Sequence, residues 1–143
     1  MTRSNRLPEK KRVGNDATVY AHFPCFDGLV PAVLAANYLE KALGWNVERF
    51  EPVNYERSRT WRSQRLPLRS AVVDFLYHPD PFMWADHHLT TFIEPADRAA
   101  LNGSTDRLLL YDASSPSCAL LLWNNLAGKL SSPTRFGEMA PVG

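Results

Sequence analysis

Short apolar runs separated by polar turns recur along the chain, and most of them have the composition of β-strands. β-branched and aromatic residues dominate the run ATVYAHF, and AVVDF is continuously apolar up to its acid, as in a strand buried on both faces of a parallel sheet. The pattern predicts strands at 17–23, 45–53, 71–75, 82–85 and 107–112.

Two longer segments have the composition of helices. Residues 29–43 are rich in Ala and Leu, and Pro31 falls early enough to be tolerated in a first turn. Residues 116–128 form the second predicted helix, with Ser115 as its N-cap and Pro116 at its first helical position. Strands that alternate with helices in this way indicate an α/β fold.

An Arg-rich segment lies between the second and third predicted strands, and its pattern is compatible with a helix or a loop. Its arginines are Arg57, Arg59, Arg62, Arg65 and Arg69. They could face an anionic substrate, because guanidinium groups bind phosphate, but a solvated helix face is the simpler interpretation. Trp61 could stack on a base, although a lone aromatic residue more often anchors its segment to the core.

We expect a mostly parallel sheet flanked by helices, in a three-layer Rossmann-like arrangement. The chain has 143 residues, enough for one domain with a substantial core. The N-terminal sequence is polar and basic, so we assign residues 1–16 to a disordered tail and residues 17–143 to the domain.

Composition excludes several classes of function. The 16 Lys and Arg residues balance the 15 Asp and Glu residues to a formal charge of +1, so no global field attracts nucleic acid or an anionic membrane. No window approaches the roughly 18 consecutive apolar residues of a membrane span. Two cysteines far apart in the sequence fit a reducing compartment, and we expect a soluble cytoplasmic protein without membrane partners.

Acidic and imidazole groups follow three of the predicted strands. They are His22, Cys25 and Asp27 after the first strand, Asp74 at the end of the third, and Asp86, His87 and His88 after the fourth. The carboxyl ends of parallel strands share one edge, where ligands bind in open α/β sheets. Carboxylates and imidazoles gathered there need a cation, and this mixture of ligands suits manganese or zinc.

Each of these residues also has a structural explanation. An acid such as Asp74 after an apolar run is often a helix cap or a loop carboxylate, and Asp27-Gly28 could form a turn with a positive φ at the glycine. We favour a small buried group for Cys25 and a surface position in a turn for His78. Asp112 lies at a strand end and could reach the site, although helix capping also accounts for the polar residues around it.

The motifs HFPCFDG, VVDF and WADHH occur in the order and context found in the DHH phosphoesterases, which the chain resembles over residues 17–126. That family includes RecJ-type exonucleases, oligoribonuclease-like enzymes and manganese pyrophosphatases. The phrase DHHLTTF resembles the continuation in a less-studied branch of the family. Cys25 stands where the family has the first aspartate of its first motif, and the spacing from His22 to Asp27 also differs.

The resemblance implies a centre with two divalent ions, Mn²⁺ in the first instance, with Mg²⁺ and Zn²⁺ as alternatives. It implies that Asp74 bridges the two ions, that His22 holds one of them, and that Asp27 and His87 hold the other. It also implies that Asp86 orients the histidine pair and that His88 contacts the phosphoryl group. Such a centre hydrolyses a phosphodiester or phosphoanhydride with a metal-activated water. The implied substrate is a small phosphorylated compound or a short oligonucleotide.

Two parts of the family pattern have no match before Gly143. They are the fourth motif, which supplies a later aspartate, and the smaller C-terminal domain, so we expect a catalytic domain that is incomplete at its C-terminus. These gaps, together with Cys25, leave an alternative open. The chain could be a catalytically impaired module that binds metal or nucleotide and retains the fold.

Overall fold

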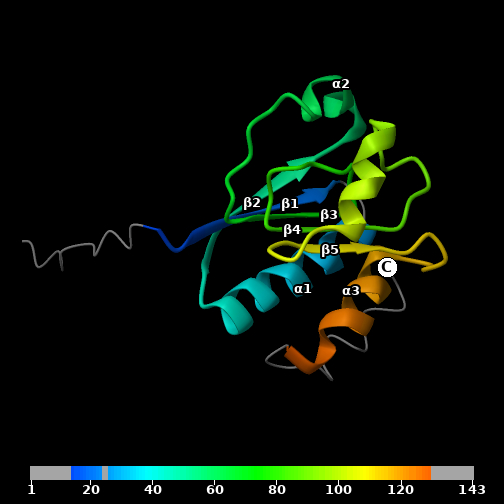
Figure 1. The fold of residues 1–143 in the computed structure, drawn as a ribbon. Helices are drawn as coiled ribbons and strands as arrows, with labels where there is room; N and C mark the ends of the chain where they lie inside the picture. Colours follow the sequence, from blue (N-terminus) through cyan, green and yellow to red (C-terminus); the bar gives the residue numbers. More distant parts are fainter. Residues whose placement is uncertain (1–13, 24–25, 130–143) are drawn as a thin grey trace, which may run out of the picture.

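The computed structural model describes residues 14–23 and 26–129, and it contains a five-stranded sheet with helices on both faces (Figure 1). The strands are β1 (Asp16–His22), β2 (Asn46–Val53), β3 (Ser70–Val73), β4 (Met83–Asp86) and β5 (Leu108–Tyr111). The α-helices are α1 (Phe26–Leu43), α2 (Ser58–Trp61) and α3 (Cys118–Leu126), and the 3₁₀ helices are η1 (Tyr55–Arg57), η2 (Pro95–Asn102) and η3 (Ala127–Lys129).

All neighbouring strands are parallel, in the order β2-β1-β3-β4-β5. The predicted α/β class with a parallel sheet and flanking helices is therefore confirmed. The chain moves to one side of β1 to form β2 and to the other side to form β3. The strand order reverses between β1 and β3, and in doubly wound sheets ligands bind beside such a reversal, at the carboxyl ends of the strands.

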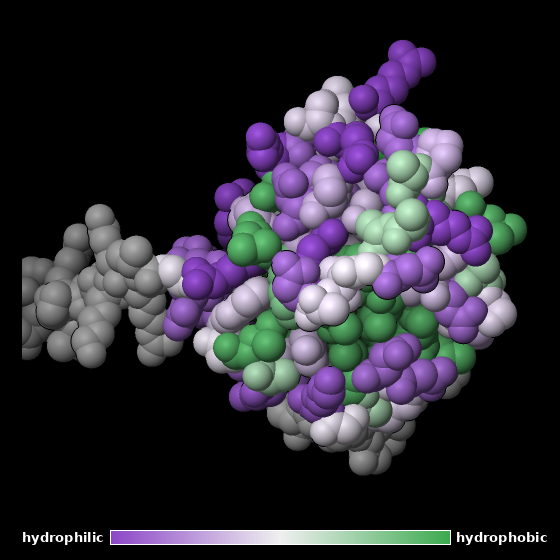
Figure 2. All heavy atoms as spheres, in the orientation of Figure 1, coloured by the Kyte–Doolittle hydropathy of each residue, from purple (hydrophilic) through white to green (hydrophobic). Residues whose placement is uncertain are grey.

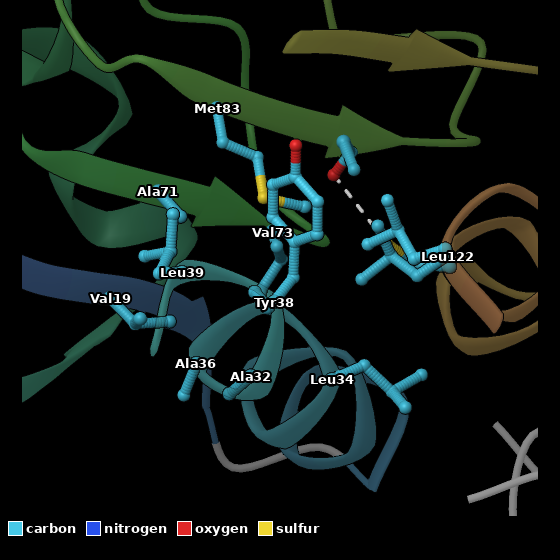
Figure 3. Close-up of a cluster of buried hydrophobic side chains, with 14 of the residues drawn as sticks. Val19, Ala32, Leu34, Ala36, Tyr38, Leu39, Ala71, Val73, Met83 and Leu122 are labelled. Carbon is cyan, nitrogen blue, oxygen red and sulfur yellow. Dashed lines mark hydrogen bonds between the residues drawn. The ribbon is translucent and has the colours of Figure 1, made fainter. Parts of the chain in front are cut away.

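Strands β3 and β4 are buried on both faces, and their successive side chains point to opposite sides of the sheet. Val19, Val73 and Ala85 belong to a cluster with α1 and α3 (Figure 3), whereas Tyr20, Val72 and Trp84 pack on the other face. Figure 1 shows α1 and α3 below the sheet, with α2 and the yellow-green η2 above it. The result is a three-layer arrangement, with helices on both faces of a parallel sheet.

Helix α1 begins at Phe26, three residues before the predicted start. Pro31 therefore lies inside the helix rather than in its first turn, so that expectation was wrong. The helix ends at Leu43, and the next residue, Gly44, has a φ of +68°, a conformation that glycine adopts without the steric cost of a side chain. The N–H groups of Gly44 and Trp45 donate to the carbonyls of Glu40 and Leu39, which satisfies the last turn.

Helix α3 begins later than predicted, and Ser117 rather than Ser115 is its N-cap. The Ser117 backbone is extended, and its hydroxyl oxygen accepts a hydrogen bond from the N–H of Leu120 at 3.0 Å. The Ser115 hydroxyl instead donates to the Ser117 carbonyl. Sequence alone could not choose between two serines that flank Pro116, because both have a hydroxyl that can cap.

The Arg-rich segment forms η1, the short helix α2 and a loop. Trp61 is fully buried, and its indole N–H donates to the Leu76 carbonyl at 3.0 Å, so its predicted anchoring role is confirmed. Arg62 pairs with Asp97 of η2 at 2.8 Å, and Arg57 donates to Gln64. Two of the five arginines therefore hold neighbouring segments together rather than facing a ligand.

His78 is buried, which contradicts the predicted surface position. Its Nδ1 accepts from the Asp80 N–H at 3.1 Å, so Nε2 carries the proton and donates to the Gln64 carbonyl at 2.8 Å. A turn sequence suggested exposure, but the turn folds back beneath Trp61. Burial lowers the pKa of His78, and nearby Arg62 acts in the same direction, against the hydrogen bond to Gln64 and the charge of Asp80.

Among residues 14–23 and 26–129, none of the helices combines the length and the hydropathy needed to cross a membrane. In Figure 2, apolar residues gather over the α1 and α3 side of the visible face, and hydrophilic residues dominate the α2 side.

We expect His78 to make stability depend on pH. The unfolded chain binds a proton near the ordinary histidine pKa of about 6.5. The folded chain resists protonation until a lower pH, so stability that is present above pH ~6.5 is lost as the pH falls through the folded-state pKa. The free energy of unfolding should fall by about 1 kcal/mol more in the wild type than in His78→Asn over this window. Parallel pH profiles from urea denaturation would contradict this assignment.

Candidate metal centre

Acidic and imidazole side chains from three strands and one helix meet at the carboxyl edge of the sheet. Asp74 follows β3 directly, Asp86 ends β4, and His87 and His88 come next; one ligand atom from each of these four residues lies within 4.8 Å of the others. His22 ends β1 and Asp27 lies in the first turn of α1. Both contact this four-residue cluster by single pairings described below.

The backbone holds Asp74 in an unusual conformation. Its φ is +56°, a left-handed value that Asp and Asn tolerate better than most residues. Its N–H donates to the Ala85 carbonyl at 2.9 Å, which keeps the residue tied to β4. The next two carbonyls, of Phe75 and Leu76, accept hydrogen bonds at 3.0 Å from the indole N–H groups of two buried tryptophans. The turn that presents Asp74 is therefore fixed by the core beneath it.

The Asp74 carboxyl group is 1% exposed, and neither of its oxygens has a hydrogen-bond partner among the described residues. Its Oδ2 lies 3.5 Å from His22 Nδ1, and its Oδ1 lies 3.7 Å from His87 Nε2. Burial raises the pKa of Asp74 to about 8, with further increases from the charges of Asp27 and Asp86 and an opposing effect of His88. A buried carboxylate without donors requires a proton or a cation.

His87 has a tautomer that its surroundings determine. Its Nδ1 lies 3.0 Å from the carbonyl oxygen of Ser115, which can only accept, so Nδ1 carries the proton. In the neutral ring, Nε2 then carries a lone pair and can only accept. It nevertheless faces two carboxylate oxygens, Asp27 Oδ2 at 3.2 Å and Asp74 Oδ1 at 3.7 Å. These three acceptor atoms repel one another, and their close approach becomes favourable when a cation lies between them.

His88 is oriented by Asp86. The two side chains meet at 2.8 Å between Nδ1 and Oδ1, and this hydrogen bond is the main reason why the pKa of His88 is raised. Asp86 is fully buried, whereas the His88 side chain is 37% exposed. Of the adjacent histidines, His88 is therefore the one more accessible from solvent, because His87 is only 14% exposed.

His22 lies between the cluster and an aromatic wall. Its ring packs against Tyr55, with ring centroids 5.1 Å apart, and against Phe75, with centroids 6.2 Å apart. The side chain is 22% exposed. His22 is thus held by packing, with Nδ1 directed at Asp74.

The donor set fits a divalent cation. Of the five buried carboxylate oxygens that lack hydrogen-bond partners among the described residues, four lie at this edge, namely Asp27 Oδ1, both oxygens of Asp74 and Asp86 Oδ2; the fifth, Asp97 Oδ2, belongs to η2. Together with the imidazole nitrogens, the four at this edge form a mixed oxygen and nitrogen set, which suits manganese or zinc and also accommodates magnesium. Unpartnered carboxylates in a native core are rare, and their concentration at one edge gives a cluster that could hold a cation.

Gly28 permits the close approach of α1 to the site. A side chain at this position would place its Cβ 1.9 Å from the His22 carbonyl oxygen. The alternative prediction, that Asp27-Gly28 forms a turn with a positive φ at the glycine, is wrong, because both residues lie in α1. Glycine is required here for space, and the approach brings Asp27 to His87.

The sequence singled out two further residues, Cys25 and Asp112. Cys25 lies outside the described residues. Asp112 is exposed and accepts hydrogen bonds from the N–H and hydroxyl of Ser114, which lower its pKa. It forms a local turn at the end of β5.

Two contributors to the site have no signal in the sequence. The Ser115 carbonyl, which orients His87, is a backbone group that any residue could supply. Cys118 lies behind the cluster, with its thiol 3.4 Å from the Ala85 carbonyl, and burial, followed by the charges of Asp86 and Asp74, raises its pKa. Its thiol is therefore a packing group rather than a nucleophile.

We expect Asp74→Asn to stabilise the cation-free chain. Asparagine keeps the shape and tolerates the left-handed backbone but carries no charge. The cost of the buried carboxylate appears as the pH rises above its unfolded pKa near 3.9 and is complete above about 8. At pH ~9 with a chelator, the free energy of unfolding should increase by about 1–3 kcal/mol. Asp112→Asn, an exposed acid at the same edge, is the control, and a less stable Asp74→Asn chain would refute the interpretation.

We expect Gly28→Ala to destabilise the chain by about 2–4 kcal/mol, because the added methyl group overlaps backbone rather than a flexible side chain. Gly128→Ala is a matched control, since a Cβ there meets no atom within 4 Å. Thermal unfolding of both variants measures the difference. Equal midpoints would show that α1 does not need this close approach.

Comparisons of the chain with protein-family models, curated protein sequences and solved structures found no match. The likeness to the DHH phosphoesterases therefore depends on the three motifs and stays a prediction.

Proposed function

We propose that this chain is the metal-binding domain of a DHH-type phosphoesterase that uses manganese, with the buried Asp74 carboxylate at the centre of its metal site. The observation that carries the proposal is the position of this group. Its two unpartnered oxygens face imidazoles from different strands, Oδ1 toward His87 and Oδ2 toward His22. A carboxylate in this position can bridge two cations.

The residues divide into two sets around Asp74. Asp27 and His87 share one side of it, with their side chains 3.2 Å apart, and His22 lies at its other oxygen. Bound cations would neutralise the phosphoryl oxygens and lower the pKa of a bound water. The same division is implied by the resemblance to the DHH family.

His88 is the residue best placed to contact the phosphoryl group. It is the more exposed imidazole of the pair, and Asp86 holds its Nδ1–H. The opposite edge of the ring is then oriented for a hydrogen bond to a substrate oxygen. Asp86 acts as a positioning residue, because its own carboxylate is fully buried.

The proposed substrate is a small phosphodiester or phosphoanhydride, or a short oligonucleotide. A cation centre can attract such a group without a basic surface, and the chain has a formal charge of only +1. Recognition would then be local, through the edge of the sheet, rather than through a long-range field.

Manganese binding and hydrolysis of bis(p-nitrophenyl) phosphate test the proposal. We expect the wild type to bind Mn²⁺ and to hydrolyse the diester. Asp74→Asn should weaken binding at least about 100-fold and reduce turnover by a similar factor, because the bridging group loses its charge. Asp112→Asn should behave as the wild type, since this acid is exposed and bonds only within its own turn.

Three outcomes separate the alternatives. An absence of Mn²⁺ binding in the wild type would remove the proposal. Binding without hydrolysis would support an impaired module that retains the fold, and Cys25→Asp then tests whether an acid restores turnover. Equal binding by the wild type and Asp74→Asn would place the cation elsewhere.

A further inference from the structure

A groove follows the edge of the sheet where the strands begin, opposite the candidate metal centre. It has a volume of about 960 Å³, within the range of roughly 300–1,000 Å³ for small-molecule pockets. Because all five strands are parallel, their amino ends share this edge (Figure 1). Each strand contributes to the lining the residue at or just before its start, namely Asp16, Trp45, Arg69, Phe82 and Arg107. Since Arg69 and Asp74 flank β3, the groove lies roughly 16 Å from the candidate metal centre.

Two aromatic side chains in the lining meet across the sheet. Trp45 precedes β2 and Phe82 precedes β4, and both β1 and β3 lie between these strands. The two rings nevertheless meet edge to face, with centroids 5.1 Å apart. Both also pack against the core formed with α1 and α3. The core therefore fixes this aromatic pair, which closes one side of the groove.

Hydrogen bonds fix the loops that form the rest of the groove. The Leu66 N–H donates to Asp80 Oδ2 at 3.0 Å, and the Phe82 N–H donates to the Leu68 carbonyl at 2.9 Å. The loop before β3 is thus joined twice to the turn before β4. Arg107 donates three further hydrogen bonds to residues 77–81, which tie this turn to the start of β5. The groove is therefore formed before any ligand binds.

Two guanidinium groups of the lining have donors to spare. Among residues 14–23 and 26–129, neither Arg65 nor Arg69 forms an ion pair or a side-chain hydrogen bond. The acids of the lining each accept a hydrogen bond, Asp16 from Asn46, Asp80 from Leu66 and Asp106 from Ser104. The N–H groups of the two arginines are therefore available to an anion. Three Asp and three Arg residues balance the formal charge of the lining, which favours a ligand with a single anionic group over a polyanion.

Arg69 is held in a defined orientation. Its Cζ lies 5.9 Å from the centroid of the Trp45 ring, a cation–π contact that orients the guanidinium without using its hydrogen-bond donors. The side chain is only half-buried, so its N–H groups can reach a ligand in the groove. A planar guanidinium presented in this way can bind a carboxylate or a phosphate through two hydrogen bonds.

The remaining accessible surface of the groove is apolar. Leu68 is 69% exposed, and Pro67 and Pro79 are also exposed, one on each of the two joined loops. A bare ion at the arginines would leave these side chains in contact with water. An anion attached to an apolar body would cover them, and this burial is favourable.

We propose that this groove is a second ligand site, which binds a small organic oxyanion. Arg65 and Arg69 hold its carboxylate or phosphate group, and Leu68 and Phe82 contact its apolar body. The site is independent of the proposed function, because it lies at the opposite edge and contains no residue of the Asp and His cluster.

Phenyl phosphate and benzoate, each compared with neutral benzyl alcohol, test the proposal on the metal-free full chain. Removing divalent ions with a chelating resin prevents either anion from binding through a metal at Asp74. We expect both anions to shift the NMR signal of the Trp45 indole N–H. At least one should bind about tenfold more tightly than benzyl alcohol, the gain that a charge-assisted hydrogen bond provides. The tighter of the two identifies the preferred oxyanion.

Three variants separate the anionic from the apolar contacts. Arg69→Gln should weaken binding of the anions about tenfold and leave the affinity for benzyl alcohol unchanged. Leu68→Ser should weaken all three ligands by a similar factor, about threefold, because each has the same ring. Arg59→Gln is the matched control, since Arg59 is an exposed arginine of α2 outside the lining.

Two results would overturn the proposal. One is equal affinity for the three ligands, and the other is an equal loss of anion binding in Arg69→Gln and Arg59→Gln. Signals that shift at His22 and His87 but not at Trp45 would place the anion at the other edge and would also contradict it. Because no metal is present, a failure of the chain to bind Mn²⁺ or to hydrolyse a diester leaves these measurements unaffected.

Discussion

The buried carboxylate of Asp74 requires a positive charge nearby, and the described residues around it supply neither a hydrogen-bond donor nor a cationic side chain. The group is 1% exposed, has no hydrogen-bond donor among the described residues, and lies near two further carboxylates, the half-buried Asp27 and the buried Asp86. Water cannot relieve the charge, and no Lys or Arg side chain pairs with it in the described part of the chain. The cost is therefore inherent in the fold and is removed only by a proton or a cation.

The fold resists the rearrangement that would relieve this cost. Trp61 and Trp84 hold the carbonyls of the turn after Asp74 from within a packed aromatic cluster. Gly28 brings α1 against the end of β1, and Cys118 fills the space behind β4. Both cores thus support the same edge of the sheet, so the Asp and His side chains are held in place without an ion, which is the preorganisation that a cation site would require.

The sequence by itself determined the α/β class, the approximate positions of five strands and the acids and histidines at their ends, because strand burial leaves an apolar signal and turns leave a polar one. It misplaced His78, the start of α1 and the cap of α3, where several residues offered equivalent local chemistry. Only the tertiary structure decided that Asp27 meets His87, that Ser115 presents its carbonyl and that Gly28 leaves room for a backbone oxygen. Those contacts join residues far apart in the chain, and their geometry depends on strand order, which no local pattern encodes.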